Sequence, residues 1–168
     1  MKKVLVMAAQ GVNDKDLAQI LSALEQKGIA VEIASTDIGA FKGMDGEEFQ
    51  ANMSLNDALA AAGGFEALVL PGGKDSEKLS RIREAVQLVG LFSEQGKIVA
   101  SVCDGCGLML RGVEPHGKRI AAQEKEFENI WGVQASYENR PVVVDGNLIT
   151  SNGEDLQAFT DEVAKHLG

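Results

Sequence analysis

The sequence predicts an α/β fold, a mainly parallel central sheet with helices on both faces. Two observations carry this prediction. Short apolar runs of strand length alternate along the chain with longer segments of helical periodicity. Hydrophobic residues make up 45% of the 168 residues, enough for a substantial core. Since no repeat or low-complexity stretch interrupts the pattern, we expect a single domain over residues 1–168.

The chain opens with a strand, a helix and a second strand. Val4–Ala9 is a short apolar run with polar and turn-forming residues directly after it, and it predicts the first core strand. Residues 14–27 follow with apolar side chains at i, i+3, i+4 and i+7, and Gly28 is a helix stop signal. Ala30–Ala34 is the second strand.

A hairpin, a strand and a helix follow. Residues 40–55 contain the turn signal Asp45-Gly46 and favour a small hairpin. Ala67–Leu70 is a short buried strand that ends at Pro71-Gly72-Gly73. The apolar spacing after this turn predicts one helix over residues 76–95.

The last part of the chain repeats the alternation. Residues 97–103 form a further apolar strand. Val142–Val144 and Leu148–Thr150 flank Asp145-Gly146-Asn147, which predicts a hairpin. Residues 154–167 have the periodicity of a final helix.

Charge and cysteine content narrow the class of protein. The formal net charge is −9 and no basic stripe is visible, which argues against nucleic-acid binding. The apolar run after Lys2 and Lys3 is too short for a signal peptide, and no segment is long enough to cross a membrane. Two cysteines three residues apart do not make a secreted disulfide framework, so we expect a cytoplasmic protein.

Cys103 is the most informative residue. It ends the strand at 97–103, and Asp104-Gly105-Cys106-Gly107 follows at once. A strand that stops at a nucleophile, with glycines where a helix must start, is typical of a nucleophile elbow. Such a turn lifts the side chain to the carboxyl edge of the sheet among free backbone N–H groups. Gly11–Asp16 and Gly72-Gly73 follow strands that end at the same edge, so we expect a site there.

Several motifs together resemble the ThiJ/PfpI family. They are Leu70–Gly73, Ala100–Gly105, Val142–Asn147 and Ser151, in a chain of fitting length and opening. The resemblance implies a three-layer flavodoxin-like sandwich with a nucleophile elbow, and a homodimer or higher homo-oligomer. Nothing indicates an organic cofactor, because no phosphate-cradling glycine motif occurs, and no regular spacing suggests a metal site.

The resemblance also implies roles for individual residues. Cys103 matches the family's nucleophile, and Asp16 matches an acidic residue that hydrogen-bonds it. The N–H groups of Gly73 and Asp104 would form an oxyanion hole. Gly72, Cys106 and Gln123 fall in supporting positions.

Three residues depart from the family pattern. Asp104 stands where the protease-like branch has histidine, Gln123 stands near a position where several members have histidine or tyrosine, and Asp16 is one methylene shorter than the usual glutamate. A carboxylate at 104 sets a like charge beside the thiolate. These departures argue against a protease of the Cys-His kind.

Simpler structural roles stay open for these residues. Cys103 could be a small buried hydrophobe, and the two glycines could serve only a tight turn. Asn13 and Asp16 have the spacing of a helix capping box. Cys103 and Cys106 have the spacing of a thioredoxin-type pair, although a core position is favoured for Cys106.

Together with the position of Cys103, the resemblance implies a cysteine-dependent enzyme acting on a small carbonyl or related electrophile, of glyoxalase, deglycase or hydratase type. The alternative is a non-catalytic redox sensor or chaperone in which Cys103 is oxidised. An intracellular protease or amidase is a third option, which Asp104 disfavours. The adduct that Cys103 carries after exposure to methylglyoxal, compared with exposure to peroxide, would distinguish the enzyme from the redox sensor.

Overall fold

The computed structural model describes residues 2–123 and 135–167. The strands of its main sheet are β1 (Lys3–Met7), β2 (Ala30–Ser35), β5 (Met53–Ser54), β6 (Ala67–Leu70), β7 (Ile98–Val102), β10 (Val143–Asp145) and β11 (Leu148–Ser151). They lie in the order β10-β11-β7-β6-β1-β2-β5. Only the hairpin β10–β11 pairs antiparallel within this sheet, so the predicted mainly parallel sheet is confirmed.

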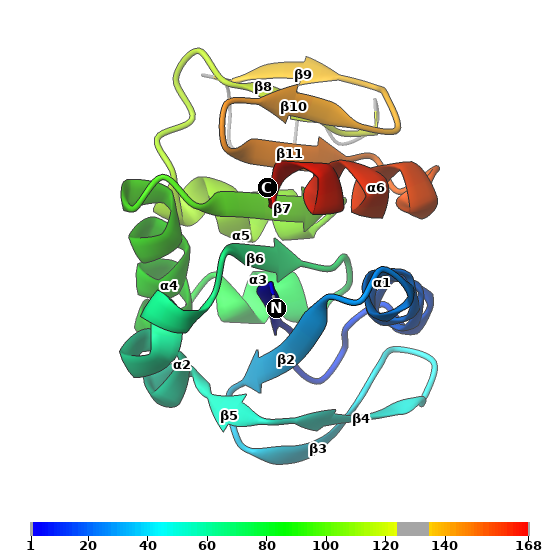
Figure 1. Ribbon diagram of the computed structural model, residues 1–168, viewed down its shortest axis with the longest axis vertical. Coiled ribbons are helices and arrows are strands. Elements are labelled where there is room, and N and C mark those ends of the chain that lie inside the picture. The colour runs from blue at the N-terminus through cyan, green and yellow to red at the C-terminus, as the bar shows by residue number, and fades with distance from the viewer. Residues whose placement is uncertain (1, 124–134, 168) are drawn as a thin grey trace.

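Helices cover both faces of the sheet (Figure 1). They are α1 (Asp14–Gln26), α2 (Leu55–Ala61), α3 (Asp75–Leu79), α4 (Arg83–Glu94), α5 (Gly105–Gly112) and α6 (Leu156–His166), with a short 3-10 turn η1 at Ala62–Gly64. Two apolar clusters divide the core between the faces. One joins the sheet to α1 and α6, and the other joins it to α2, α4 and α5. The predicted three-layer flavodoxin-like sandwich is therefore confirmed.

Two small sheets lie beside the main one. The hairpin expected within residues 40–55 is present as β3 (Gly39–Lys42) and β4 (Glu48–Ala51), which pair antiparallel. The sequence did not predict the short parallel pair β8 (Arg119–Ala121) and β9 (Ser136–Glu138). Helix α2 was not predicted either, because seven residues are too few to show a clear period.

The single helix predicted over residues 76–95 is wrong. The chain forms α3 and α4 with a break between them. The Ser80 hydroxyl donates to the carbonyl of Glu77 at 2.6 Å, and Ile82 is extended with φ −97° and ψ 120°. A side chain that bonds the local backbone competes with helix continuation, which accounts for the break.

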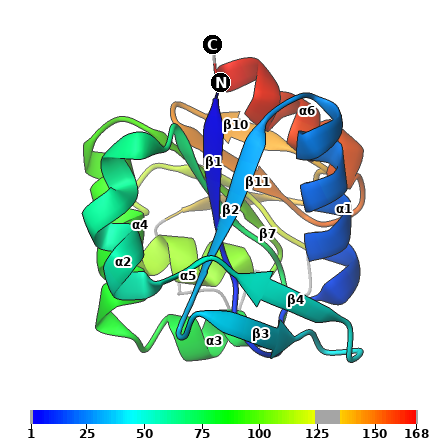
Figure 2. The ribbon, with the colours of Figure 1, turned by 60° about the horizontal axis from the view of Figure 1, so that its bottom comes forward.

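The parallel strands run from one end of the molecule to the other. Figure 2 shows the N- and C-termini together at one end and α3 at the other. Because β1, β6, β7 and β11 run the same way, their carboxyl ends all meet at the α3 end.

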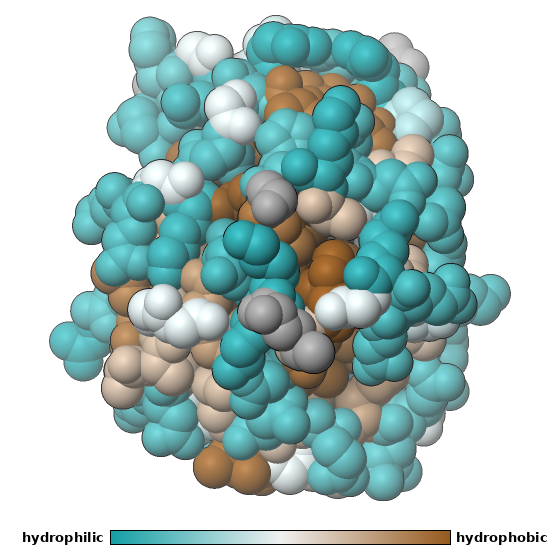
Figure 3. Space-filling view, viewed as in Figure 1, coloured by the Kyte–Doolittle hydropathy of each residue, from teal (hydrophilic) through white to brown (hydrophobic). Residues whose placement is uncertain are grey.

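The face of the molecule in Figure 3 is covered mostly by hydrophilic side chains. Within the described residues, no helix has the length and apolarity needed to cross a bilayer.

Candidate active site

Cys103 occupies a strained turn between β7 and α5. Its φ is +47°, the only positive φ of a non-glycine residue in the described chain. Backbone strain of this kind costs about 1–3 kcal/mol and occurs mostly at functional sites. Gly105 lets α5 begin here, because a Cβ at that position would lie 2.5 Å from the carbonyl oxygen of Leu70. The elbow predicted from the sequence is thus present.

A pocket of about 300 Å³ surrounds the elbow. Its lining comes from six separate parts of the chain: Asn13, Asp16, Met44, Gly72, Gly73, Cys103, Asp104, Gln123 and Gly153. The three segments that the sequence assigned to this edge of the sheet therefore do meet. The hairpin β3–β4 and the turn after β11 complete the pocket.

The sulfur of Cys103 is held by the turn that follows β11. Its thiol donates to the main-chain oxygen of Asn152 at 3.1 Å. The amide of Gln123 donates to the same oxygen at 3.2 Å, which places Gln123 beside the sulfur. A Cβ at Gly153 would lie 2.6 Å from the sulfur, so this position has room only for glycine.

Asp16 faces the site from the first turn of α1. Asn13 caps this helix, since its side chain accepts the N–H of Asp16 at 3.1 Å. The N–H of Asn13 donates to the oxygen of Gly72 at 2.8 Å, so the reciprocal half of a capping box is not made. The carboxylate of Asp16 instead faces the Gly72 turn, whose main-chain N–H favours its ionised form. Burial, opposed by this N–H group, raises the pKa of Asp16, and the neighbouring Asp104 carboxylate raises it further.

Glycine at 72 allows Asp16 and Cys103 to approach from either side. A Cβ there would lie 2.8 Å from Oδ2 of Asp16 and 3.4 Å from Cβ of Cys103. The next residue, Gly73, forms an antiparallel bridge with Val12, and its φ is +133°. Among the described residues, no group accepts the N–H of Gly73. The Pro-Gly-Gly turn is therefore fixed by the loop before α1 while this donor stays available.

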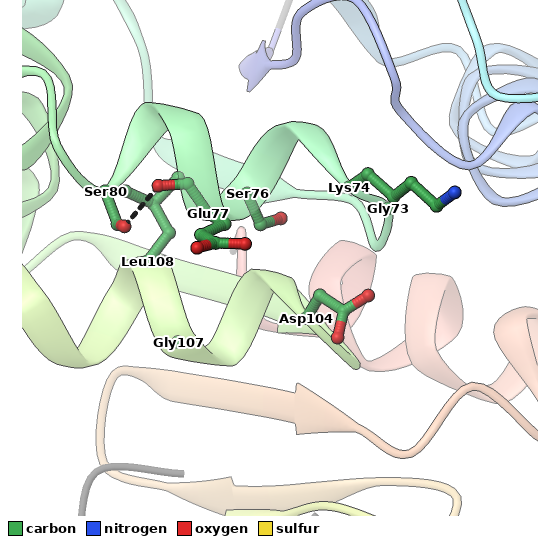
Figure 4. Close-up of a pocket in the computed structure, with 8 residues that line it drawn as sticks. All are labelled: Gly73, Lys74, Ser76, Glu77, Ser80, Asp104, Gly107 and Leu108. Atoms are coloured by element: carbon green, nitrogen blue, oxygen red, sulfur yellow. Dashed lines mark hydrogen bonds between the residues drawn. The ribbon is translucent and has the colours of Figure 1, made fainter. Parts of the chain in front are cut away.

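Asp104 lies between the Cys103 pocket and a second cavity. That cavity, of about 540 Å³, separates the α3 segment from the start of α5. Figure 4 shows Ser76 and Glu77 of α3 and the C-cap residue Ser80 facing it, with Asp104 at one end and the side chain of Lys74 extending away from Glu77. Asp104 is exposed and lines both spaces.

Cys106 lies apart from the pocket. It is 0% exposed, and the Ser101 hydroxyl donates to its sulfur at 3.2 Å. The two cysteines are not joined in a disulfide. The core position favoured for Cys106 is thus the one observed.

The two histidines of the chain, His116 and His166, are both exposed, and neither lines the pocket. The described residues contain no cluster of His, Cys, Asp or Glu suited to a metal ion.

Sequence reasoning missed Asn152, Gly153 and Met44. The signal for the first two was present, because Asn152-Gly153 is a turn dipeptide directly after the apolar run of β11. Only the pairing of β11 with β7 shows that this turn lies beside Cys103. Met44 reaches the pocket because Asp14 accepts the N–H groups of Asp45 and Glu47 at 2.9 and 2.7 Å and fixes the hairpin loop.

The fold and the elbow define an α/β protein of the flavodoxin-like class with a cysteine at the carboxyl edge of its sheet. A family model for the DJ-1/PfpI family matches residues 2–166. The chain belongs to this family.

Curated relatives match over nearly their whole length. An uncharacterized protein of Archaeoglobus fulgidus is 33% identical over 98% of this chain and 98% of its own. A deglycase of Thermococcus kodakarensis is 30% identical over 98% of this chain and 99% of its own. The deglycase PfpI of Pyrococcus furiosus is 28% identical over the same shares.

Solved structures agree with the fold. A two-domain protein of Anabaena variabilis, with DJ-1/ThiJ/PfpI-like and ferritin-like domains, superposes with a TM-score of 0.91 and is 32% identical. The match covers 100% of this chain and 48% of that one. A ThiJ/PfpI domain protein of Brachyspira murdochii has a TM-score of 0.89 at 24% identity, covering 99% of this chain and 95% of its own, and supports the fold alone.

Proposed function

We propose that this chain is a single-domain, cysteine-dependent deglycase-type enzyme that acts on small carbonyl compounds or their adducts. The observation that carries the proposal is the position of Cys103, in a positive-φ elbow that opens into a pocket shared with Asp16 and Gly73. Two relatives that match this chain end to end are named deglycases. We expect the enzyme to work in the cytoplasm as a homodimer or higher homo-oligomer.

The first step is addition of the thiol to an aldehyde carbon. Asp16 takes the proton from the sulfur of Cys103, the C–S bond forms, and the electron pair of the C=O π-bond moves to oxygen. The N–H groups of Gly73 and Asp104 stabilise this oxyanion, an effect worth about 3 kcal/mol per donor in other enzymes. Asp16 then returns its proton to the oxygen, which completes a hemithioacetal.

The raised pKa of Asp16 suits this role. A carboxyl group whose pKa lies nearer to neutrality exchanges its proton more readily than an ordinary surface aspartate. Gln123 cannot shuttle a proton, but its amide donates to the Asn152 oxygen that also holds the thiol. It therefore orients the sulfur.

The test is to follow consumption of methylglyoxal and the mass of the Cys103 peptide in parallel. We expect turnover by the parent protein, an adduct at Cys103, loss of turnover in Cys103→Ser and little change in Cys106→Ser. Absence of turnover, together with rapid formation of a sulfinic acid at Cys103 in dilute peroxide, would instead support a redox sensor.

A further inference from the structure

Asp75 is a buried carboxyl group that the proposed reaction does not use. It is 2% exposed and is the first residue of α3, two residues after Gly73. Its Oδ2 accepts the N–H of Ala9 at 2.9 Å. Among the described residues, its Oδ1 has no hydrogen-bond partner. An unpaired carboxylate oxygen shielded from water is unfavourable, so this position penalises the charged form of the side chain.

The position of Asp75 ties together two loops of the active site. The bond from Ala9 attaches Asp75 to the chain just beyond β1, which leads into the loop before Asp16. Beside it, the N–H of Lys74 donates to the oxygen of Gly11 at 2.9 Å. The side chain of Asp75 is thus a further link between the Pro-Gly-Gly turn and the loop that places Asp16.

Asp75 is also coupled electrostatically to the elbow. Burial raises the pKa of Asp75 to about 7, the N–H groups of Ala9, Asp75 and Ser76 oppose this shift, and Asp104 raises the pKa further. The loop after β1 brings no titratable side chain, and the α3 segment itself brings the exposed Lys74, Glu77 and Lys78. Asp104 also raises the pKa of Asp16, so it interacts with both carboxyl groups.

We propose that Asp75 is a positioning residue whose protonation state controls the reactivity of Cys103 near neutral pH. The neutral carboxyl keeps the bond to Ala9 and adds no charge. The ionised form adds a negative charge to the edge that already carries Asp104, and it disfavours the Cys103 thiolate. The inference rests on the proposed function only in taking Cys103 as the reacting group.

The experiment measures the rate of Cys103 alkylation by iodoacetamide from pH 5.5 to 9. It compares the parent, Asp75→Asn and Glu66→Gln. Glu66 is a matched control, because its carboxylate accepts the N–H of Lys3 at 2.9 Å, at the opposite end of β1. We expect Asp75→Asn to match the parent at pH 5.5 and to react about threefold faster at pH 8, as the loss of one partly screened charge would cause. Glu66→Gln should follow the parent throughout.

Two results would overturn the inference. A profile of Asp75→Asn that parallels the parent at every pH, with only the melting temperature changed, would leave Asp75 a structural residue. An equal effect in Glu66→Gln would show a general response to charge. Asp75→Ser, also neutral, carries the same expectation should the asparagine variant fold poorly. If iodoacetamide alkylates Cys103 in none of these proteins at any pH, the proposed function is rejected as well.

Discussion

The carboxylate of Asp16 lies against Gly72, the first glycine of the Pro-Gly-Gly turn, where a Cβ would be 2.8 Å from its Oδ2. Asn13, not Asp16, supplies the cap of α1. The two roles that the sequence left open for Asp16 are therefore separated in space. Its carboxylate belongs to the pocket, and the helix start has its own capping residue.

This separation predicts the behaviour of Asp16→Asn. We expect alkylation of Cys103 to slow by about tenfold, the equivalent of one charge-assisted hydrogen bond of about 1.4 kcal/mol. Asp57→Asn is the control, because Asp57 occupies the same N3 position in α2 and completes a capping box with Ser54. That variant should lose about 1 kcal/mol of stability and keep its thiol chemistry. If Asp16→Asn instead lost stability and kept the alkylation rate of Cys103, Asp16 would be a helix cap.

Gly153→Ala should disturb the sulfur directly. The new Cβ would lie 2.6 Å from the sulfur of Cys103, at a residue whose φ is +91°. Gly46→Ala is matched in backbone, with φ +93° and no atom within 4 Å of its Cβ. Both variants should lose about 1–2 kcal/mol from the left-handed conformation. Only Gly153→Ala should also change the alkylation rate of Cys103, and equal rates in the two variants would contradict the contact.

The carboxylate of Asp104 predicts charge selectivity at Cys103. We expect a cationic methanethiosulfonate, the aminoethyl reagent, to modify Cys103 faster than the anionic sulfonatoethyl reagent, relative to their rates with a free thiol. Asp104→Asn should reduce this preference about fivefold at low salt, and 1 M salt should weaken it in the parent. Glu94→Gln, in the last residue of α4 at the other end of the sheet, should leave the preference unchanged. A preference insensitive to Asp104→Asn would mean that its carboxylate does not act on the sulfur.

The buried Asp75 predicts how stability depends on pH. Its pKa is about 7 in the folded protein against 3.8 when exposed, so ionisation destabilises the fold. The stability contributed by the neutral form is present below pH 4 and is lost as the pH rises from about 4 to about 7, by at most about 4 kcal/mol. Urea unfolding at intervals between pH 4 and 8 should show that the stability of Asp75→Asn relative to the parent rises across this window. If the stability difference between Asp75→Asn and the parent did not change with pH, the carboxyl group of Asp75 would be solvated.

Local patterns predicted most of the fold. The apolar runs of β1, β6 and β7 and the periodicity of α1 and α6 identify their structures without tertiary information. The break at Ser80 was missed because the apolar spacing continues across it, and a side chain bonded to the Glu77 carbonyl leaves no trace in the period. Short parallel pairs such as β8–β9 depend on partners distant in sequence, which no local pattern reveals.

Some residues of the candidate site could likewise be identified from local sequence, and others could not. Cys103, Gly72 and Gly73 could be found because their motifs encode local turns. Asp75 could not, because its burial and its bond to Ala9 arise from a contact across 66 residues. The turn at Asn152 and Gly153 is recognisable as a turn, but its place beside the sulfur follows from the parallel pairing of β11 with β7.

The bond from Cys103 to Asn152 spans 49 residues of chain, which has a consequence for synthesis. A ribosome adds about 5–20 residues per second, so the 49 residues that separate the thiol from its acceptor take roughly 2–10 s to make. During that interval β11 is absent, and the Cys103 thiol lacks the oxygen that holds it. The hydrogen bond that fixes the Cys103 thiol can therefore form only after the strand beside β7 has been added.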